Sequence, residues 1–363
     1  MSGLQRRHAL RRALGLGALW LGPRASIAGP GSDVDDGRAA RAAGAQQPAA
    51  ALHWRESVTL ALGTRIWLRL AHINAAQADV ALRAALVAVQ RVDEAASLFR
   101  DDSALQSLNR HGALHHAPPE LRALLHTALR AAEVSEGRFD PTVQPLWRTW
   151  YEAQGHMPGA NALGAARARL GWREVDLGPR SIRLPRPGMA LTLNGIVQGF
   201  AADQALAALQ RHGVQHALID TGEWWPLGHD PAGQPWRLGL AEPQRAPAAA
   251  PGVGEPSLAR SRYLPDLLGD GRALACSSAE TLRFTADGSE HHILDPRTGH
   301  SPRELAMVVV AARTAAWADA LSKPLMMGSA AQALVLARRF GVDVLTVDKA
   351  GRRQASAGLR LAG

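Results

Sequence analysis

Residues 191–220 read LTLNGIVQGFAADQALAALQRHGVQHALID, and this stretch decides the fold class. An apolar segment at 189–193 predicts a strand that leads into it. A helix is expected to follow Gly199 and to end at Gly213, which suits a helix C-terminus. The apolar residues 216–220 predict a second strand. One strand–helix–strand unit is therefore expected here.

A similar unit is expected nearer the C-terminus. The patterns predict a strand at 307–312, helices at 315–327 and 330–340, and a strand at 342–347. Two units in which strands alternate with helices imply an α/β or α+β core with layered helices.

The N-terminal part of the globular region also alternates. Residues 57–64 and 66–68 alternate like a strand, and a helix is expected over 77–96. The helix is expected to place Val80, Leu86, Val87 and Val92 on one face. Pro118-Pro119-Glu120 predicts the start of a further helix, which Gly137 ends.

Residues 1–28 have the composition of an export signal. Arginines precede a short apolar run, and Ser26-Ile27-Ala28 offers small residues at a cleavage site. The pair Arg6-Arg7 favours the twin-arginine route, with general secretion as the alternative. The apolar run is too short for a lasting transmembrane anchor. A periplasmic protein is expected, with a flexible linker at 29–50 and a mobile insertion at 244–262.

Charge and cysteine content exclude other classes. The formal charge is +9, and residues 1–28 contain five arginines and no acids, which leaves 9 − 5 = +4. With no basic helix, nucleic-acid binding is not expected. Cys276 is the single cysteine, so no intramolecular disulfide forms. Lys323 and Lys349 are the only lysines.

Gly195 and Gly199 lie between the predicted strand and helix. Glycines at this place let backbone amides approach a phosphate at the helix N-terminus. Close packing of the turn is the alternative explanation, and the spacing alone does not decide between them.

HHILDPRTGH, residues 291–300, concentrates groups that bind or transfer protons. Asp295 to Gly299 has the composition of a turn, and a capped hairpin with exposed histidines is one interpretation. His291 and His292 are adjacent and point opposite ways on a strand, so only one can serve a given pocket. A single imidazole suits a general base better than a zinc site.

Two further segments carry acids in apolar surroundings. Asp319 lies near the start of a predicted helix, where the helix dipole favours a carboxylate. Residues 137–143, GRFDPTV, have the composition of a helix end and a turn. Neither segment identifies a reaction by itself.

The order of six segments along the chain resembles the ApbE family, FAD:protein FMN transferases of the bacterial periplasm. FDPTV and H-I-x-D-P-x-T-G are its most specific motifs. The resemblance implies one α+β catalytic domain over 51–363, layered and T-fold-like, with mixed sheets flanked by helices. The six segments are 97–109, 137–147 (GRFDPTVQPLW), 194–203 (NGIVQGFAAD), 216–223 (HALIDTGE), 291–299 (HHILDPRTG) and 318–322 (ADALS).

The resemblance also implies an activity. The chain is expected to bind FAD and Mg²⁺ and to move FMN onto a Ser or Thr hydroxyl of a partner flavoprotein, releasing AMP. By the same resemblance His292 is the catalytic base, and Asp319 and the backbone carbonyl of Val197 are metal ligands. The residues implied for FAD binding are Asn109, Asp140, Thr142, Gly195, Gln198, Asp203, Asp295 and Thr298.

Three positions depart from the usual family pattern. Gln198 replaces a common lysine, and Gly222-Glu223-Trp224 replaces Gly-Gly-Asp. Lys323 replaces a threonine that ligates the metal. An ammonium 4 Å from a dication meets roughly 8 kcal/mol of repulsion at a dielectric of 20. Either Lys323 turns to solvent or its ammonium replaces part of the metal charge, so we expect weakened Mg²⁺ binding.

Two other functions remain open. One is a non-catalytic FAD carrier, and the other is a FAD pyrophosphatase in which water replaces the acceptor hydroxyl. The presence of both His292 and Asp319 favours the transferase. The sequence does not identify the acceptor. Several tryptophans could stack on a flavin or an adenine, and none is assigned: Trp54, Trp67, Trp147, Trp150, Trp224 and Trp225.

Overall fold

The computed structural model describes residues 51–243 and 264–362. The predicted signal peptide, linker and insertion lie outside the described residues. Within the described part, no helix has both the length and the apolar character needed to cross a membrane. The elements are β1 (His53–Ala61), β2 (Thr64–His72), α2 (Ala75–Ala96), α3 (Ala104–His111), β3 (Ala113–His115), α4 (Pro119–Val134), α5 (Gln144–Glu152), α6 (Ala160–Arg167), η1 (Trp172–Glu174), β4 (Asp176–Leu177), β5 (Ser181–Arg183), α7 (Val197–Arg211), β6 (His216–Asp220), β7 (Trp224–Leu227), β8 (Arg237–Leu238), β9 (Leu267–Leu268), β10 (Ala273–Ser278), β11 (Leu305–Ala312), α8 (Ala315–Met326), α9 (Ala330–Phe340), β12 (Asp343–Asp348) and β13 (Arg353–Ala355).

The central sheet has eight strands in the order β1-β2-β6-β7-β10-β11-β12-β13. The expected α+β class is confirmed, but mixed sheets are not found, because every described strand pair is antiparallel. The connections explain this. Hairpins join several neighbours, and two successive helices, α8 and α9, join β11 to β12, so the chain returns in the opposite direction.

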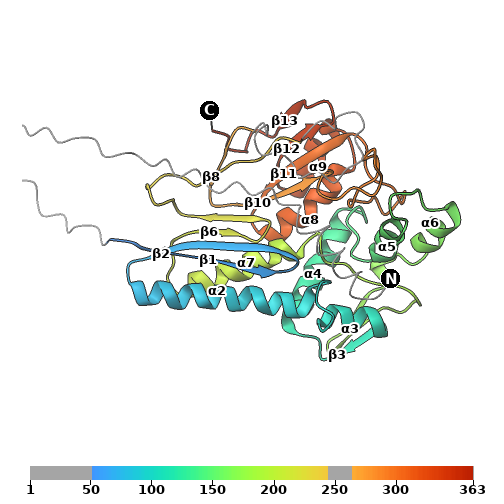
Figure 1. Cartoon of the computed structure of the whole chain (residues 1–363), viewed down its shortest axis with the longest axis horizontal. Coiled ribbons are helices and arrows are strands. Elements are labelled where there is room, and N and C mark those ends of the chain that lie inside the picture. Colours follow the sequence, from blue (N-terminus) through green and yellow to red (C-terminus); the bar gives the residue numbers. More distant parts are fainter. Residues whose placement is uncertain (1–50, 244–263, 363) are drawn as a thin grey trace, which may run out of the picture.

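Helices cover one face of this sheet. In Figure 1, α2 runs along β1 and β2, and α8 lies beside β10 and β11. The strand β11 is buried on both faces. Its Val308 and Val310 face a core that includes residues of α8 and α9, while Met307 and Val309 face the segment that carries β8 and β9. This double burial explains why β11 is apolar without alternation.

The predicted alternating segment near residue 60 is a β-hairpin. Leu62 and Gly63 form its two-residue turn, and both have positive φ, 55° and 75°. Such turns match the twist of the paired strands. Gly63 is also required sterically, because a Cβ there would lie 2.6 Å from the Phe99 ring.

The helix predicted at 77–96 is present as α2, but its predicted face is partly wrong. Val80 and Val87 are exposed, at 36% and 48% of their surface. The buried face carries mainly alanines and packs against α7. Small side chains let two helices approach closely, so the buried face is defined by size as well as by hydropathy.

The strand predicted at 189–193 is not a strand. These residues belong to no strand, and a side chain takes the place of a strand neighbour. The Asn109 amide donates to Leu191 O at 2.8 Å, and Leu191 N donates to Asn109 Oδ1 at 2.7 Å. Thr192 N donates to Pro141 O at 2.8 Å. The backbone is satisfied without a ladder, which apolar periodicity cannot reveal.

Candidate functional site

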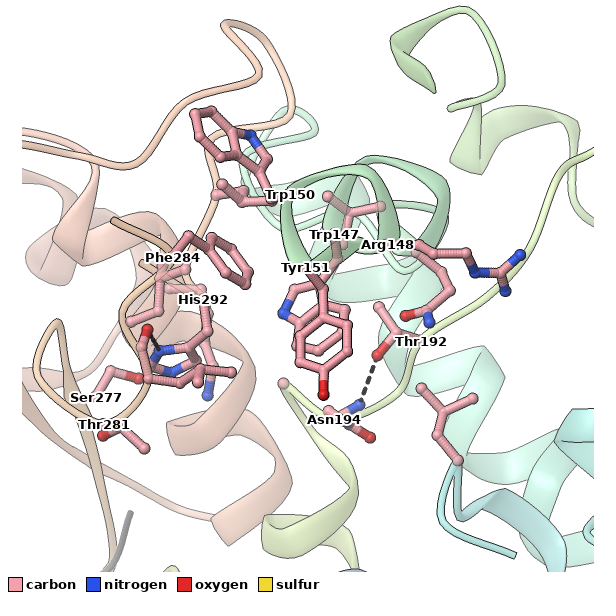
Figure 2. A pocket seen from close by; sticks show the side chains of 18 of the residues that line it. Trp147, Arg148, Trp150, Tyr151, Thr192, Asn194, Ser277, Thr281, Phe284 and His292 are labelled. Carbon is pink, nitrogen blue, oxygen red and sulfur yellow. Dashed lines mark hydrogen bonds between the residues drawn. The ribbon is translucent and has the colours of Figure 1, made fainter. Parts of the chain in front are cut away.

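A cavity of about 1350 Å³ opens between the helical layer and the loops after β10. Pockets for drug-sized ligands span roughly 300–1,000 Å³, so this one can accept a dinucleotide. Figure 2 shows His292, Ser277 and Thr281 on one side, Trp147 and Tyr151 on the other, and Asn194 below them.

The loop before α7 forms part of the cavity wall. Gly195 and Val197 line the cavity, whereas Gly199 faces α8. A Cβ on Gly199 would lie 2.2 Å from the carbonyl oxygen of Ala315. The two glycines therefore differ. Gly199 permits close helix packing, and Gly195 lines the cavity in the loop that leads into α7.

The two adjacent histidines point apart, as their spacing predicts. His291 is fully buried, and His292 lines the cavity. The Nδ1 of His292 lies 3.4 Å from Leu282 O, and since a carbonyl only accepts, this contact requires a proton on Nδ1. Nε2 is then a free acceptor. Burial, His291 and Lys323 lower the pKa of His292 to about 3, so the ring is neutral near pH 7.

Asp319 and Lys323 lie one turn apart on α8 and form an ion pair. Lys323 Nζ also donates to Asp319 O at 3.1 Å, and Gly199 N donates to Asp319 Oδ2 at 3.2 Å. Asp319 has no exposed surface. Both oxygens of the predicted metal-binding carboxylate are therefore engaged by donors from the chain itself.

Glu223 is a second buried carboxylate beside this pair, and it was not assigned from the sequence. It accepts a hydrogen bond from Cys276 N at 3.0 Å. Burial and the Asp319 charge hold its pKa well above the usual range, although Lys323 acts in the opposite direction. Its position in Gly222-Glu223-Trp224, where the motif departs from the family pattern, was the available clue.

The implied Mg²⁺ does not fit these residues as they stand. Lys323 contacts the carboxylate that would ligate it, and ammonium has no lone pair to offer a metal. No group of three or more His, Cys, Asp or Glu in the described ranges could hold a metal ion. The predicted metal position is therefore a site that already contains a cationic side chain.

Asp140 and Thr142 build one turn. The Thr142 hydroxyl and backbone N–H both donate to Asp140 Oδ1, at 2.6 and 2.7 Å. Gly171 N donates to Thr142 Oγ1 at 2.8 Å. Burial raises the pKa of Asp140, despite these bonds. Asp140 lines the cavity, and Thr142 supports it from behind.

Asp203 joins α7 to α8. Its carboxylate accepts from the backbone N–H groups of Ala315 and Ala316, at 2.8 and 2.9 Å, and from the Trp225 indole at 2.7 Å. Burial raises its pKa. Asp203 therefore caps the helix that carries Asp319 and does not line the cavity.

Asp295 and Thr298 shape the turn after His292. Asp295 accepts hydrogen bonds from the backbone and guanidinium of Arg297. Trp150 Nε1 donates to Gly299 O at 2.8 Å and anchors the turn to α5. Thr298 is exposed and accepts from His300 N.

Of the predicted site residues, those that line the cavity are Asp140, Gly195, Val197, Gln198, His292 and Lys323. Those that lie behind its walls or in supporting loops are Asn109, Thr142, Asp203, Asp295, Thr298 and Asp319.

Trp147 was left unassigned from the sequence, and it belongs to an aromatic wall of the cavity. Trp147 and Tyr151, one turn apart on α5, line the cavity and stack with centroids 5.1 Å apart and planes at 13°. Phe284 meets Trp147 edge-on. The i, i+4 spacing of two aromatics directly after FDPTV was the available indication.

The fold and the cavity define the class: an α+β protein in which a helix N-terminus, a histidine loop and an aromatic helix surround a dinucleotide-sized cavity. The chain belongs to the ApbE family, whose model matches residues 62–346.

Comparisons with individual proteins agree with this assignment. The FAD:protein FMN transferase of Treponema pallidum is 31% identical over 78% of this chain and 82% of its own length. The FAD:protein FMN transferase of Escherichia coli K12 is 26% identical over 71% and 74%. The flavin transferase ApbE from Vibrio cholerae superposes with a TM-score of 0.72 at 22% identity, over 85% of this chain and 98% of its own.

Proposed function

We propose that this chain transfers the FMN half of FAD to a Ser or Thr hydroxyl of a partner protein and releases AMP. Family membership supports the reaction class. The observation that carries the proposal is the imidazole of His292, neutral and with Nε2 free, in the cavity that also contains the loop before α7. The imidazole suits the acceptor hydroxyl, the loop before α7 lies where the diphosphate would bind, and the aromatic wall suits the flavin or the adenine.

The residues suggest how the transfer proceeds. The acceptor oxygen attacks the phosphorus on the flavin side, and the bond from this phosphorus to the bridging oxygen breaks. AMP leaves with the bridging oxygen, and a phosphodiester joins FMN to the protein. His292 Nε2 takes the hydroxyl proton. The Lys323 ammonium donates a hydrogen bond to a phosphate oxygen. Since Mg²⁺ does not fit beside Lys323, no step is assigned to it.

Incubation with FAD and an acceptor domain that carries a candidate Ser or Thr site tests this function. We expect flavin fluorescence on the acceptor in a denaturing gel and an equal amount of AMP. AMP without labelling would instead indicate a pyrophosphatase. Bound flavin without AMP would indicate a carrier.

His292→Ala tests the proposed base. We expect the variant to bind FAD and to lose labelling by at least 100-fold, because general-base catalysis typically contributes that factor. Exposed His126 on α4 provides the matched control, His126→Ala, which should label like the wild type. Labelling by His292→Ala at the wild-type rate would remove the imidazole from the reaction.

The partner and the compartment are proposed from the sequence alone. The partner is an exported flavoprotein, and residues 1–28 direct this chain to the periplasm. Fractionation of cells that express the full chain tests this, with a processed form expected in the periplasm. Retention of the full-length form in the cytoplasm would contradict it.

A further inference from the structure

We propose that Lys323 is a built-in cation that replaces the divalent metal at this site, so that FAD binds without Mg²⁺. The inference deepens the proposed function and rests on it.

Both carboxylate oxygens of Asp319 already accept hydrogen bonds from the chain itself. Lys323 Nζ forms an ion pair with Oδ1 and donates to the backbone carbonyl of the same residue. The other oxygen, Oδ2, accepts from Gly199 N at the first turn of α7. A divalent ion at Asp319 would have to share the carboxylate with this ammonium and the helix amide, and its charge would repel the ammonium.

The aliphatic part of the Lys323 side chain packs against Gly195. A Cβ on Gly195 would lie 3.3 Å from Lys323 Cε and 3.7 Å from Cδ, so the stem packs directly against the loop before α7. The side chain is 19% exposed. Lys323 therefore does not turn to solvent, which was the alternative left by the sequence. Its ammonium therefore stays within the cavity, beside the loop that leads into α7.

The Lys323 ammonium has a donor left for a ligand in the cavity. Lys323 lines the cavity, and two of its three N–H donors are directed to Asp319 among the described residues. One donor is left for a phosphate oxygen of a ligand. The ammonium and Asp319 form a buried ion pair, so the lysine occupies the place of a cation beside this carboxylate. Lys323 therefore supplies a cationic donor at the position implied for the metal.

FAD binding by the purified protein tests this, with quenching of flavin fluorescence as the readout. For the wild type we expect the same Kd, within twofold, in EDTA and in millimolar Mg²⁺. For Lys323→Thr, which restores a hydroxyl, we expect Kd to rise at least tenfold in EDTA and to recover in Mg²⁺. Mn²⁺ binding, followed by its paramagnetic resonance signal, should appear in the variant and not in the wild type.

Lys349→Thr is the matched control, since it makes the same substitution at the other lysine, which is exposed and does not line the cavity. It should behave like the wild type in both buffers. The wild-type comparison does not depend on folding of any variant. FAD binding by the wild type that requires Mg²⁺ would overturn the inference and leave the transferase intact. No binding in either buffer would overturn the proposed function itself.

Discussion

The side chain of Asn109 hydrogen-bonds both backbone groups of Leu191, 82 residues further along the chain. Asn109 lies on α3, and Leu191 precedes the loop that forms the cavity wall. The pair therefore fixes the approach to that loop from outside the site. A contribution of Asn109 to FAD binding remains a prediction. Because Asn109 does not line the cavity, it would act only through the position of this loop.

Replacement of Asn109 by leucine should be destabilising. The variant leaves a buried N–H and a buried C=O of Leu191 without partners, and each costs about 1–3 kcal/mol. We expect the free energy of unfolding in urea to fall by about 2–6 kcal/mol. Asn161→Leu, at an exposed position of α6, is the control and should change it by less than about 0.5 kcal/mol. Equal stability of the two variants would contradict this role.

Gly199→Ala should prevent close packing of α7 on α8. The added Cβ would meet Ala315 O at 2.2 Å and Ala316 N at 2.7 Å, so the helices must separate. We expect the free energy of unfolding to fall by about 3 kcal/mol or more, or the variant to fail to fold. A clash with backbone atoms cannot be relieved by rotation of a side chain. Gly164→Ala on α6 meets nothing within 4 Å and should be neutral or slightly stabilising. Thermal unfolding of both proteins measures the difference.

His291 should make stability fall in acid. Burial lowers its pKa to about 4, from an ordinary 6.5. Between these values the unfolded chain binds the proton and the folded chain does not. The stabilisation is therefore complete above pH 6.5 and is lost as pH falls toward 4. From pH 7.5 to 5, this residue should account for about 2 kcal/mol.

Urea unfolding at the two pH values, in the wild type and in His291→Gln, isolates that contribution. The variant should lose about 2 kcal/mol less than the wild type on acidification. His126→Gln, at an exposed position, should follow the wild type. An identical pH dependence for His291→Gln and wild type would show that His291 does not titrate in this range.

Trp147→Ala should weaken FAD binding about tenfold. Stacking of a base on an aromatic ring contributes about 1–3 kcal/mol, and Trp147 is stacked on Tyr151 at the cavity wall. Trp54→Ala provides the control, because Trp54 packs on Trp236 and does not line the cavity. A Kd for Trp147→Ala equal to that of the control would exclude the aromatic wall from flavin or adenine binding.

The sequence alone determined the elements whose periodicity is strong. The helices α4, α8 and α9 and the strands β11 and β12 lie within a few residues of their predicted bounds. Local spacing also predicted that His291 and His292 point apart. These features depend on neighbours in the chain, so a one-dimensional pattern contains them. The motif order then indicated the family.

Only the tertiary structure decided the environment of single groups. It replaced a predicted strand at 189–193 by a segment bonded to Asn109, and it placed alanines rather than Val80 and Val87 on the buried face of α2. It also showed that Lys323 pairs with Asp319 and does not turn to solvent. The physical reason is the same in each case. The energy of a polar or charged group depends on partners far away in sequence, and periodicity carries no information about them.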